Sequence, residues 1–142
     1  MAFELHSNFA KKIFLADLPL SKVLMENERH YPWLMLIPRR SQVSRLIDLN
    51  LEDQTQLLHE MNFIQQVLWK IFQPTQLNVA AIGNKTPQLH IHIIARFEND
   101  PAWPGTVWDH PTREPLSPEQ LKDRQVALQE ILQSEFELLT QA

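Results

Sequence analysis

The sequence predicts an α+β fold with a mostly antiparallel sheet, one central helix and a C-terminal helix. Two observations predict it: apolar runs of strand length lie on both sides of a long helical stripe, and a second helical stripe ends the chain. The resulting order of strands, helix, strand pair and helix is typical of α+β domains.

The first strands are expected near the N-terminus. Residues 13–26 should form two short strands joined by a turn at Pro19, and the apolar run WLMLIP at 33–38 should form a buried strand. A further pair, LNVAAI at 77–82 and QLHIHIIA at 88–95, is separated by GNKTP, which opens with the turn-forming dipeptide Gly-Asn. This pair predicts a hairpin.

The central helix is expected from Asn50 to Phe72. Asn50 can cap its N-terminus, and Pro74 follows its end. The apolar residues follow the i, i+3, i+4 spacing of one helix face: Leu57, Leu58, Met61, Ile64, Leu68, Ile71 and Phe72.

The C-terminal region is expected to be a loop followed by a helix. Residues 97–116 contain four prolines and show no periodicity. SPEQ at 117–120 then combines a serine cap, a proline at the first helical position and a glutamine three residues after the cap. The apolar stripe of the helix consists of Leu121, Leu128, Leu132, Phe136 and Leu139.

The totals describe an ordinary globular chain. It has 142 residues, of which 44% are hydrophobic and 21% charged, so we expect a single domain, 1–142, with one sizeable core. The net charge of −4 argues against nucleic acid as a partner. The lack of cysteine excludes disulfides, thiolate zinc sites and a cysteine nucleophile. Because neither a signal peptide nor an apolar run of membrane-spanning length is found, we expect a cytoplasmic protein without a membrane partner.

The stretch QLHIHII, residues 88–94, raises the question of function. His90 and His92 are two residues apart, so a strand directs both imidazoles to one face. The pair can be structural, provided that each buried imidazole finds a hydrogen-bond partner. It can also offer two nitrogens to a metal ion, but no third ligand stands at a telling spacing, so a metal site is unsupported.

The third interpretation is nucleophilic catalysis. A neutral imidazole is a competent nucleophile near neutral pH because its ordinary pKa is about 6.5. Attack on a phosphoanhydride would give a phosphoramidate intermediate that water can hydrolyse. A second imidazole, about 6.6–6.8 Å along the strand, could contact phosphoryl oxygens or protonate the leaving group.

QLHIHII resembles the histidine-triad (HIT) motif, H-φ-H-φ-H-φ-φ with φ apolar. YPWLMLIPRR at 31–40, the helix after it, the LNVAAIGN strand and turn, and the motif also follow the family's order. The resemblance covers about residues 10–98 and implies a HIT-like core there, with a C-terminal loop and helix at 99–142. It further implies a homodimer that acts on a small-molecule nucleotide substrate. The expected reaction is hydrolysis or nucleotidyl transfer at the α-phosphate, without a resident cofactor, although the substrate could arrive as a magnesium complex.

The resemblance also implies roles for individual residues. His90, at the middle position, would be the nucleophile that forms a covalent nucleotidyl intermediate, and His92 would contact the phosphate and help the leaving group depart. The connection from Gly83 to Thr86 looks like the family's phosphate-contacting loop. The substrate-binding candidates are Asn84, Lys85 and Thr86 in this loop and Asn27, which falls near the family's contact with ribose or base.

Two positions depart from the family pattern. The first triad position is Gln88, which makes the motif a Q-φ-H-φ-H-φ-φ variant, and the family's frequent fourth histidine aligns with Trp33. Because glutamine both donates and accepts hydrogen bonds, Gln88 can remain in a catalytic site with altered proton handling. Two alternatives stay open: a nucleotide-binding or regulatory HIT protein with little turnover, and a metal-dependent hydrolase that uses the His90–His92 pair.

The segment after the motif adds two hypotheses. Trp103 and Trp108 are expected to pack over the core, with a stacking wall for a base as the alternative. Among the arginines, which are expected to be solvated, Arg96 is the candidate for a phosphate contact because it follows the motif directly.

Overall fold

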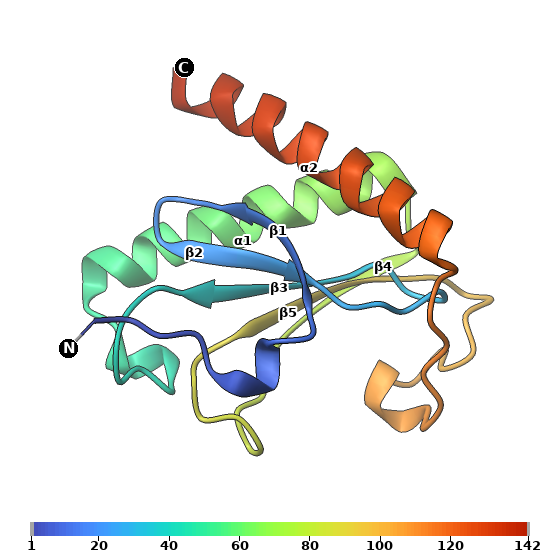
Figure 1. Cartoon of the computed structure of the whole chain (residues 1–142), viewed down its shortest axis with the longest axis horizontal. Helices are drawn as coiled ribbons and strands as arrows, with labels where there is room; N and C mark the ends of the chain where they lie inside the picture. The colour runs from blue at the N-terminus through green and yellow to red at the C-terminus, as the bar shows by residue number, and fades with distance from the viewer. Residues whose placement is uncertain (1, 142) are drawn as a thin grey trace.

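The computed structural model describes residues 2–141, with the side chains of the last helix described as far as Phe136. Five strands form one sheet in the order β1-β2-β3-β5-β4, and every neighbouring pair is antiparallel (Figure 1). The strands are β1 (Ile13–Asp17), β2 (Ser21–Met25), β3 (Trp33–Pro38), β4 (Gln76–Ala81) and β5 (Ile91–Arg96). The predicted α+β fold class with an antiparallel sheet is confirmed.

Two helices complete the fold, α1 (Leu51–Phe72) and α2 (Pro118–Gln141). The predicted start signals operate at both. The Asn50 side chain accepts a hydrogen bond from the Asp53 amide at 2.8 Å. Before α2, the amide of Gln120 donates to the Ser117 hydroxyl and the amide of Ser117 donates to the Gln120 side chain, each at 3.2 Å. These reciprocal bonds form a capping box.

The apolar stripes are only partly as predicted. Leu57, Ile64 and Leu68 are buried, but Leu58 is 56% exposed, so its assignment to the stripe is wrong. One residue corresponds to a rotation of about 100° round the helix, which turns Leu58 away from the face that Leu57 buries. Leu139, predicted for the stripe of α2, lies outside the described side chains.

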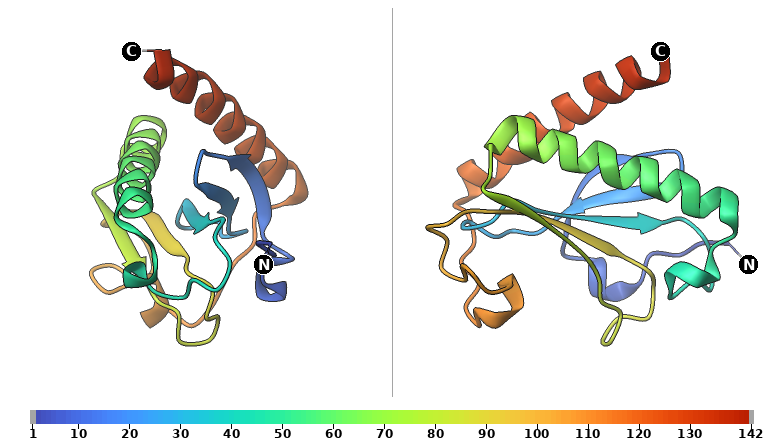
Figure 2. Two further views of the ribbon diagram at one scale, coloured as in Figure 1. Left: turned by 90° about the vertical axis from the view of Figure 1, so that its left-hand side faces the viewer. Right: turned by 180° about the vertical axis from the view of Figure 1, so that it is seen from behind.

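The sheet separates two apolar clusters. Both helices cover one face, where Leu34 and Leu36 of β3 pack in the larger cluster with residues of α1 and α2 (Figure 2). The alternate β3 residues, Trp33, Met35 and Ile37, belong to a smaller cluster on the other face. This alternation is the period of two that strand geometry imposes.

The second face is covered by two irregular segments. The N-terminal segment, residues 2–9, contributes Phe3, Leu5 and Phe9 to the smaller cluster, and the C-terminal loop, residues 97–117, contributes Val107. Figure 2 shows both segments on the side of the sheet opposite the helices. The face of the sheet that carries the motif histidines, His90 and His92, is therefore bordered by chain segments without long helices or strands.

Strand β5 begins later than predicted, at Ile91 instead of Gln88. Pro87 lacks the amide hydrogen that a strand ladder needs, and the Leu89 amide donates to the Val43 carbonyl at 2.9 Å. Residues 82–90 thus form the β4–β5 connection, and His90 lies immediately before the strand.

Candidate functional site

The two motif histidines lie side by side on the face of the sheet opposite the helices. Their ring centroids are 4.9 Å apart, with the planes at 75°. Ile91 and Ile93, the residues next to them on the opposite face, lie in the larger core. The arrangement that the spacing predicts, imidazoles on one face and isoleucines on the other, is present although β5 starts only at Ile91.

His90 is held by its own neighbourhood in the chain. Its Nδ1 lies 2.8 Å from the carbonyl oxygen of Gln88. Because a carbonyl only accepts hydrogen bonds, Nδ1 carries the proton and the neutral ring keeps its lone pair on Nε2. The edge of Phe9 packs on the ring at a centroid distance of 5.0 Å. The contact fixes one side of an imidazole whose free nitrogen can act as a nucleophile.

A pocket of about 370 Å³ adjoins His90. Ser44 and Arg45, from the connection between β3 and α1, line it together with Gly83 and Asn84 from the β4–β5 connection. Although His90 is only 6% exposed, it is therefore one wall of a cavity and not sealed in the core. A small polar ligand can reach it there.

His92 stands in more aromatic surroundings. The indole Nε1 of Trp33 donates a hydrogen bond to His92 Nδ1 at 3.0 Å, and the Trp108 ring packs edge-on at 5.0 Å. Burial of this imidazole lowers its pKa to about 4, and positive charge on His90 or on Lys12 acts in the same direction. His92 is thus neutral at physiological pH.

The Gln88 side chain turns toward the N-terminal segment. Its Oε1 accepts a hydrogen bond from the His6 amide at 2.9 Å, and its Nε2 donates to the Glu4 carbonyl at 2.8 Å. Thr86 binds the same segment, because its hydroxyl accepts a hydrogen bond from the Asn8 side chain at 2.8 Å. Both residues therefore fasten the segment that carries Phe9 to the histidine pair.

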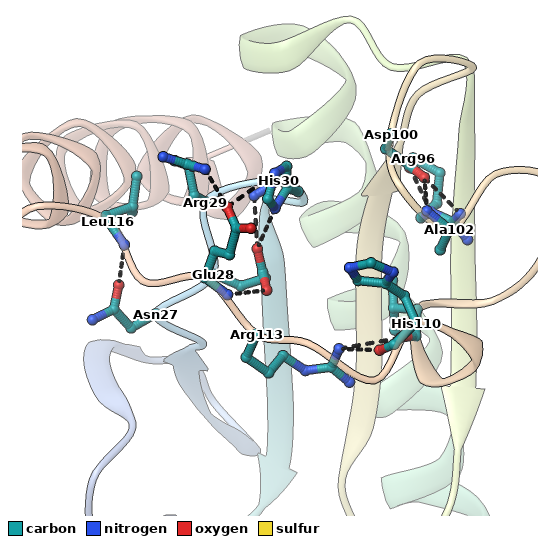
Figure 3. A network of polar contacts seen from close by, with 12 residues as sticks. Asn27, Glu28, Arg29, His30, Arg96, Asp100, Ala102, His110, Arg113 and Leu116 are labelled. Atoms are coloured by element: carbon teal, nitrogen blue, oxygen red, sulfur yellow. Dashed lines mark hydrogen bonds and ion pairs between the residues drawn. The ribbon is translucent and has the colours of Figure 1, made fainter.

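The other predicted substrate contacts are not all brought together. Asn84 lines the pocket, and Lys85 is exposed on the same connection. Asn27 lies elsewhere: its Oδ1 accepts a hydrogen bond from the Leu116 amide at 2.9 Å and so ties the β2–β3 connection to the C-terminal loop (Figure 3).

The hypothesis that Arg96 contacts phosphate is wrong. Its guanidinium makes two hydrogen bonds to the Asp100 carboxylate, at 2.8 and 3.0 Å, and a third to Asn78 at 2.8 Å. The residue is 1% exposed, and its guanidinium lies over the rings of Tyr31 and Trp103, 5.5 and 5.8 Å from their centroids. A buried guanidinium that makes three hydrogen bonds inside the protein stabilises the loop and is not available to a ligand.

Some contacts of the site had no signal in the sequence. Phe9, Ser44 and Arg45 come from irregular segments whose path over the sheet no periodicity indicates. Trp108 was predicted to pack over the core, with a stacking wall for a base as the alternative, and its ring contacts both Trp33 and His92. A metal site built on the histidine pair gains no further ligand, because no group of three His, Asp or Glu side chains suited to an ion exists within the part of the chain that the structure describes.

None of the described helices combines the length and the apolarity needed to cross a membrane.

Comparison with known proteins agrees with this fold. The profile of the HIT domain matches residues 8–99. This chain belongs to the HIT family. A histidine triad protein from Bradyrhizobium japonicum is similar in structure at a TM-score of 0.88, with 40% sequence identity over 92% of this chain and 98% of that one. One from Marinobacter aquaeolei has a TM-score of 0.89 and 36% identity over 94% and 98% of the two chains.

A curated relative of this HIT protein carries an activity in its name. Bis(5'-nucleosyl)-tetraphosphatase from Schizosaccharomyces pombe is 33% identical over 72 residues, which are 47% of this chain and 39% of the relative. The match thus spans well under half of that enzyme's length.

Proposed function

We propose that this HIT protein is a nucleotide hydrolase or nucleotidyl transferase that acts at the α-phosphate of a nucleotide conjugate through a covalent nucleotidyl-His90 intermediate. The observation that carries the proposal is the hydrogen bond from His90 Nδ1 to the Gln88 carbonyl, because it leaves a lone pair on Nε2 of a residue that lines a pocket. The name of the Schizosaccharomyces pombe relative supports the class of activity.

The proposed reaction has two steps. In the first, the His90 Nε2 lone pair forms a bond to the α-phosphorus, the bond from phosphorus to the leaving-group oxygen breaks, and its electron pair leaves with that oxygen. The imidazolium character that develops is stabilised by the Gln88 carbonyl at Nδ1–H. In the second, an acceptor oxygen bonds to phosphorus, the P–N bond returns its pair to Nε2, and the proton of water is released to solvent.

His92 is proposed to hold a phosphoryl oxygen by a hydrogen bond. Asn84, which lines the pocket, and Lys85 and Thr86 on the same connection are the proposed contacts for the rest of the phosphate group, with Lys85 supplying positive charge. Asn27 lies outside the pocket that His90 lines and is bound to the Leu116 amide, so its contact with ribose or base stays a prediction.

At the first motif position, Gln88 is proposed to have a structural role: it holds the N-terminal segment in place. Its side-chain amide binds residues 4 and 6 and so keeps Phe9, in the same segment, against the His90 ring. Its backbone carbonyl accepts the hydrogen bond that orients His90. The Q-φ-H-φ-H-φ-φ variant would then keep the covalent step and lose one ionisable group.

A homodimer is proposed as well. β4 is an edge strand of the sheet, and Val79 on it and Ile82 directly after it are 40% and 39% exposed. An edge with unpaired backbone groups and apolar side chains is a surface that a second copy could cover. Size-exclusion chromatography with light scattering would measure the state, and Val79→Glu should favour the monomer.

The proposal is tested by intact mass after rapid quenching with a panel of nucleotide conjugates, with magnesium and with chelator. Wild type should gain one nucleotidyl group and His90→Ala should not, while His59→Ala, a change on the exposed face of α1, should behave like wild type. Binding without adduct or turnover would instead identify a regulatory nucleotide-binding protein. If the turnover of a substrate supplied without magnesium disappears when a chelator is added, the metal-dependent hydrolase is favoured.

A further inference from the structure

Trp33 makes one hydrogen bond that determines where His92 carries its proton. The indole is 3% exposed, and its Nε1 lies 3.0 Å from His92 Nδ1. An indole nitrogen donates and never accepts, so Nδ1 must present a lone pair. A neutral imidazole with its lone pair on Nδ1 has its hydrogen on Nε2.

The two histidines therefore hold opposite tautomers. A carbonyl oxygen keeps the hydrogen of His90 on Nδ1, and an indole N–H keeps the hydrogen of His92 on Nε2. One ring thus offers a lone pair and its neighbour, 4.9 Å away, offers a hydrogen-bond donor.

A second proton on His92 is disfavoured from several sides. A hydrogen at Nδ1 would face the indole N–H at hydrogen-bonding distance, and the ring is only 7% exposed. Two neighbouring ionisable groups, Lys12 and His90, both oppose protonation of His92 when they carry a positive charge. Two polar groups near the histidine pair are already engaged elsewhere: Lys12 is paired with Glu26, and the Gln88 amide is bound to the N-terminal segment. A neutral imidazole can donate a hydrogen bond from Nε2, but it cannot release that proton to a leaving group without becoming an imidazolate.

We propose that Trp33 keeps His92 as a neutral Nε2–H donor and not a proton donor, so that the site accepts conjugates whose leaving group departs as a stable anion. This inference rests on the function proposed above. An anhydride with phosphate, sulfate or carboxylate meets the requirement, because the electron pair of the broken P–O bond stays on an oxyanion that needs no proton. A phosphoramidate does not, because its nitrogen must gain a proton when the P–N bond breaks.

The test uses a series of aryl esters of adenosine 5'-monophosphate, with phenols whose pKa values run from about 7 to about 10. For wild type, kcat/KM should fall by about tenfold for each unit of phenol pKa, because no acid assists departure. Trp33→Phe keeps an aromatic ring but removes the N–H. It should make this dependence shallower and raise the poorest substrate relative to the best by about tenfold. Trp108→Phe makes the same change on the other indole beside His92 and should leave the dependence as in wild type.

The tautomer is measured separately from turnover. Nitrogen chemical shifts of the His92 side chain, identified with a His92→Gln variant, should show Nδ1 unprotonated and Nε2 protonated from pH 5.5 to 8 in wild type, a range that starts above the pKa of about 4. Trp33→Phe should give a mixture of both tautomers.

A flat dependence on phenol pKa in wild type, or a hydrogen on His92 Nδ1, would overturn the inference while the proposed function stood. Absence of turnover and of adduct for every ester would refute the proposed function, and the substrate class with it. The nitrogen spectrum distinguishes these two failures because it needs no catalysis.

Discussion

Replacing Gln88 by leucine should loosen the N-terminal segment without unfolding the sheet. The change removes the two hydrogen bonds to the His6 amide and the Glu4 carbonyl. Each is worth about 0.5–1.5 kcal/mol net, and because the site is partly exposed we expect the lower half of the sum, about 1–2 kcal/mol. The bond between Thr86 and Asn8 and the apolar contacts of Phe9 remain, so the segment should open more often and stay attached on average.

Amide hydrogen exchange at His6 measures this directly. Since 1.36 kcal/mol corresponds to a factor of ten, exchange at His6 should become about 5- to 30-fold faster, while amides in β3 and β5 keep their protection. Gln88→Glu is the matched variant, because it retains an acceptor for the His6 amide but sets a carboxylate against the Glu4 carbonyl. It should loosen residue 4 more than residue 6. Unchanged exchange at His6 in Gln88→Leu would refute the anchoring role, and equal acceleration across the sheet would show a global loss of stability instead.

Three further predictions concern stability and pH. Glu60→Ala should lower the free energy of unfolding by about 2–4 kcal/mol in urea titrations, because two buried backbone amides of the β1–β2 turn lose their acceptor; a loss below 1 kcal/mol would contradict this. Arg96→Ala should lower the free energy of unfolding by about 3–5 kcal/mol because it leaves the buried Asp100 carboxylate without its partner. The KM for nucleotide should stay unchanged, whereas a selective rise in KM would support the phosphate contact. The pKa of His92 is about 4 in the folded chain against 6.5 ordinarily, so the unfolded chain binds more protons between these values. The free energy of unfolding should therefore fall by up to about 3 kcal/mol as the pH drops from about 6.5 to about 4, and His92→Gln should flatten this slope.

Regular elements were predictable because their signals are local. The Asn50 cap, the serine–proline start of α2 and the apolar runs of the strands each act within a few residues, and the structure contains all of them. Where two local signals competed, the prediction failed. The alternation in QLHIHIIA predicted a strand from Gln88. Pro87 and the hydrogen bond from the Leu89 amide to the Val43 carbonyl instead keep the residues up to His90 in the connection, so the strand begins at Ile91.

The site was predictable only to the extent that it lies in one motif. The spacing of His90 and His92 was enough to place both rings on one face. The partners that orient them come from far along the chain, and the side-chain amide of Gln88 or the guanidinium of Arg96 could bind many groups. Which group each one meets depends on the path of the N-terminal segment and the C-terminal loop, and neither path is encoded by periodicity.

The two ends of the chain differ in what can be attached to them. A polypeptide fused at the N-terminus would be joined to the segment of Glu4 and His6, which Gln88 holds next to Phe9 and the nucleophile candidate. The far end of α2 projects from the opposite side of the sheet, beyond the larger core (Figure 1). An affinity tag at the N-terminus is therefore attached to the segment that borders His90, and preparations tagged at the two ends should be compared before their properties are treated as those of one protein.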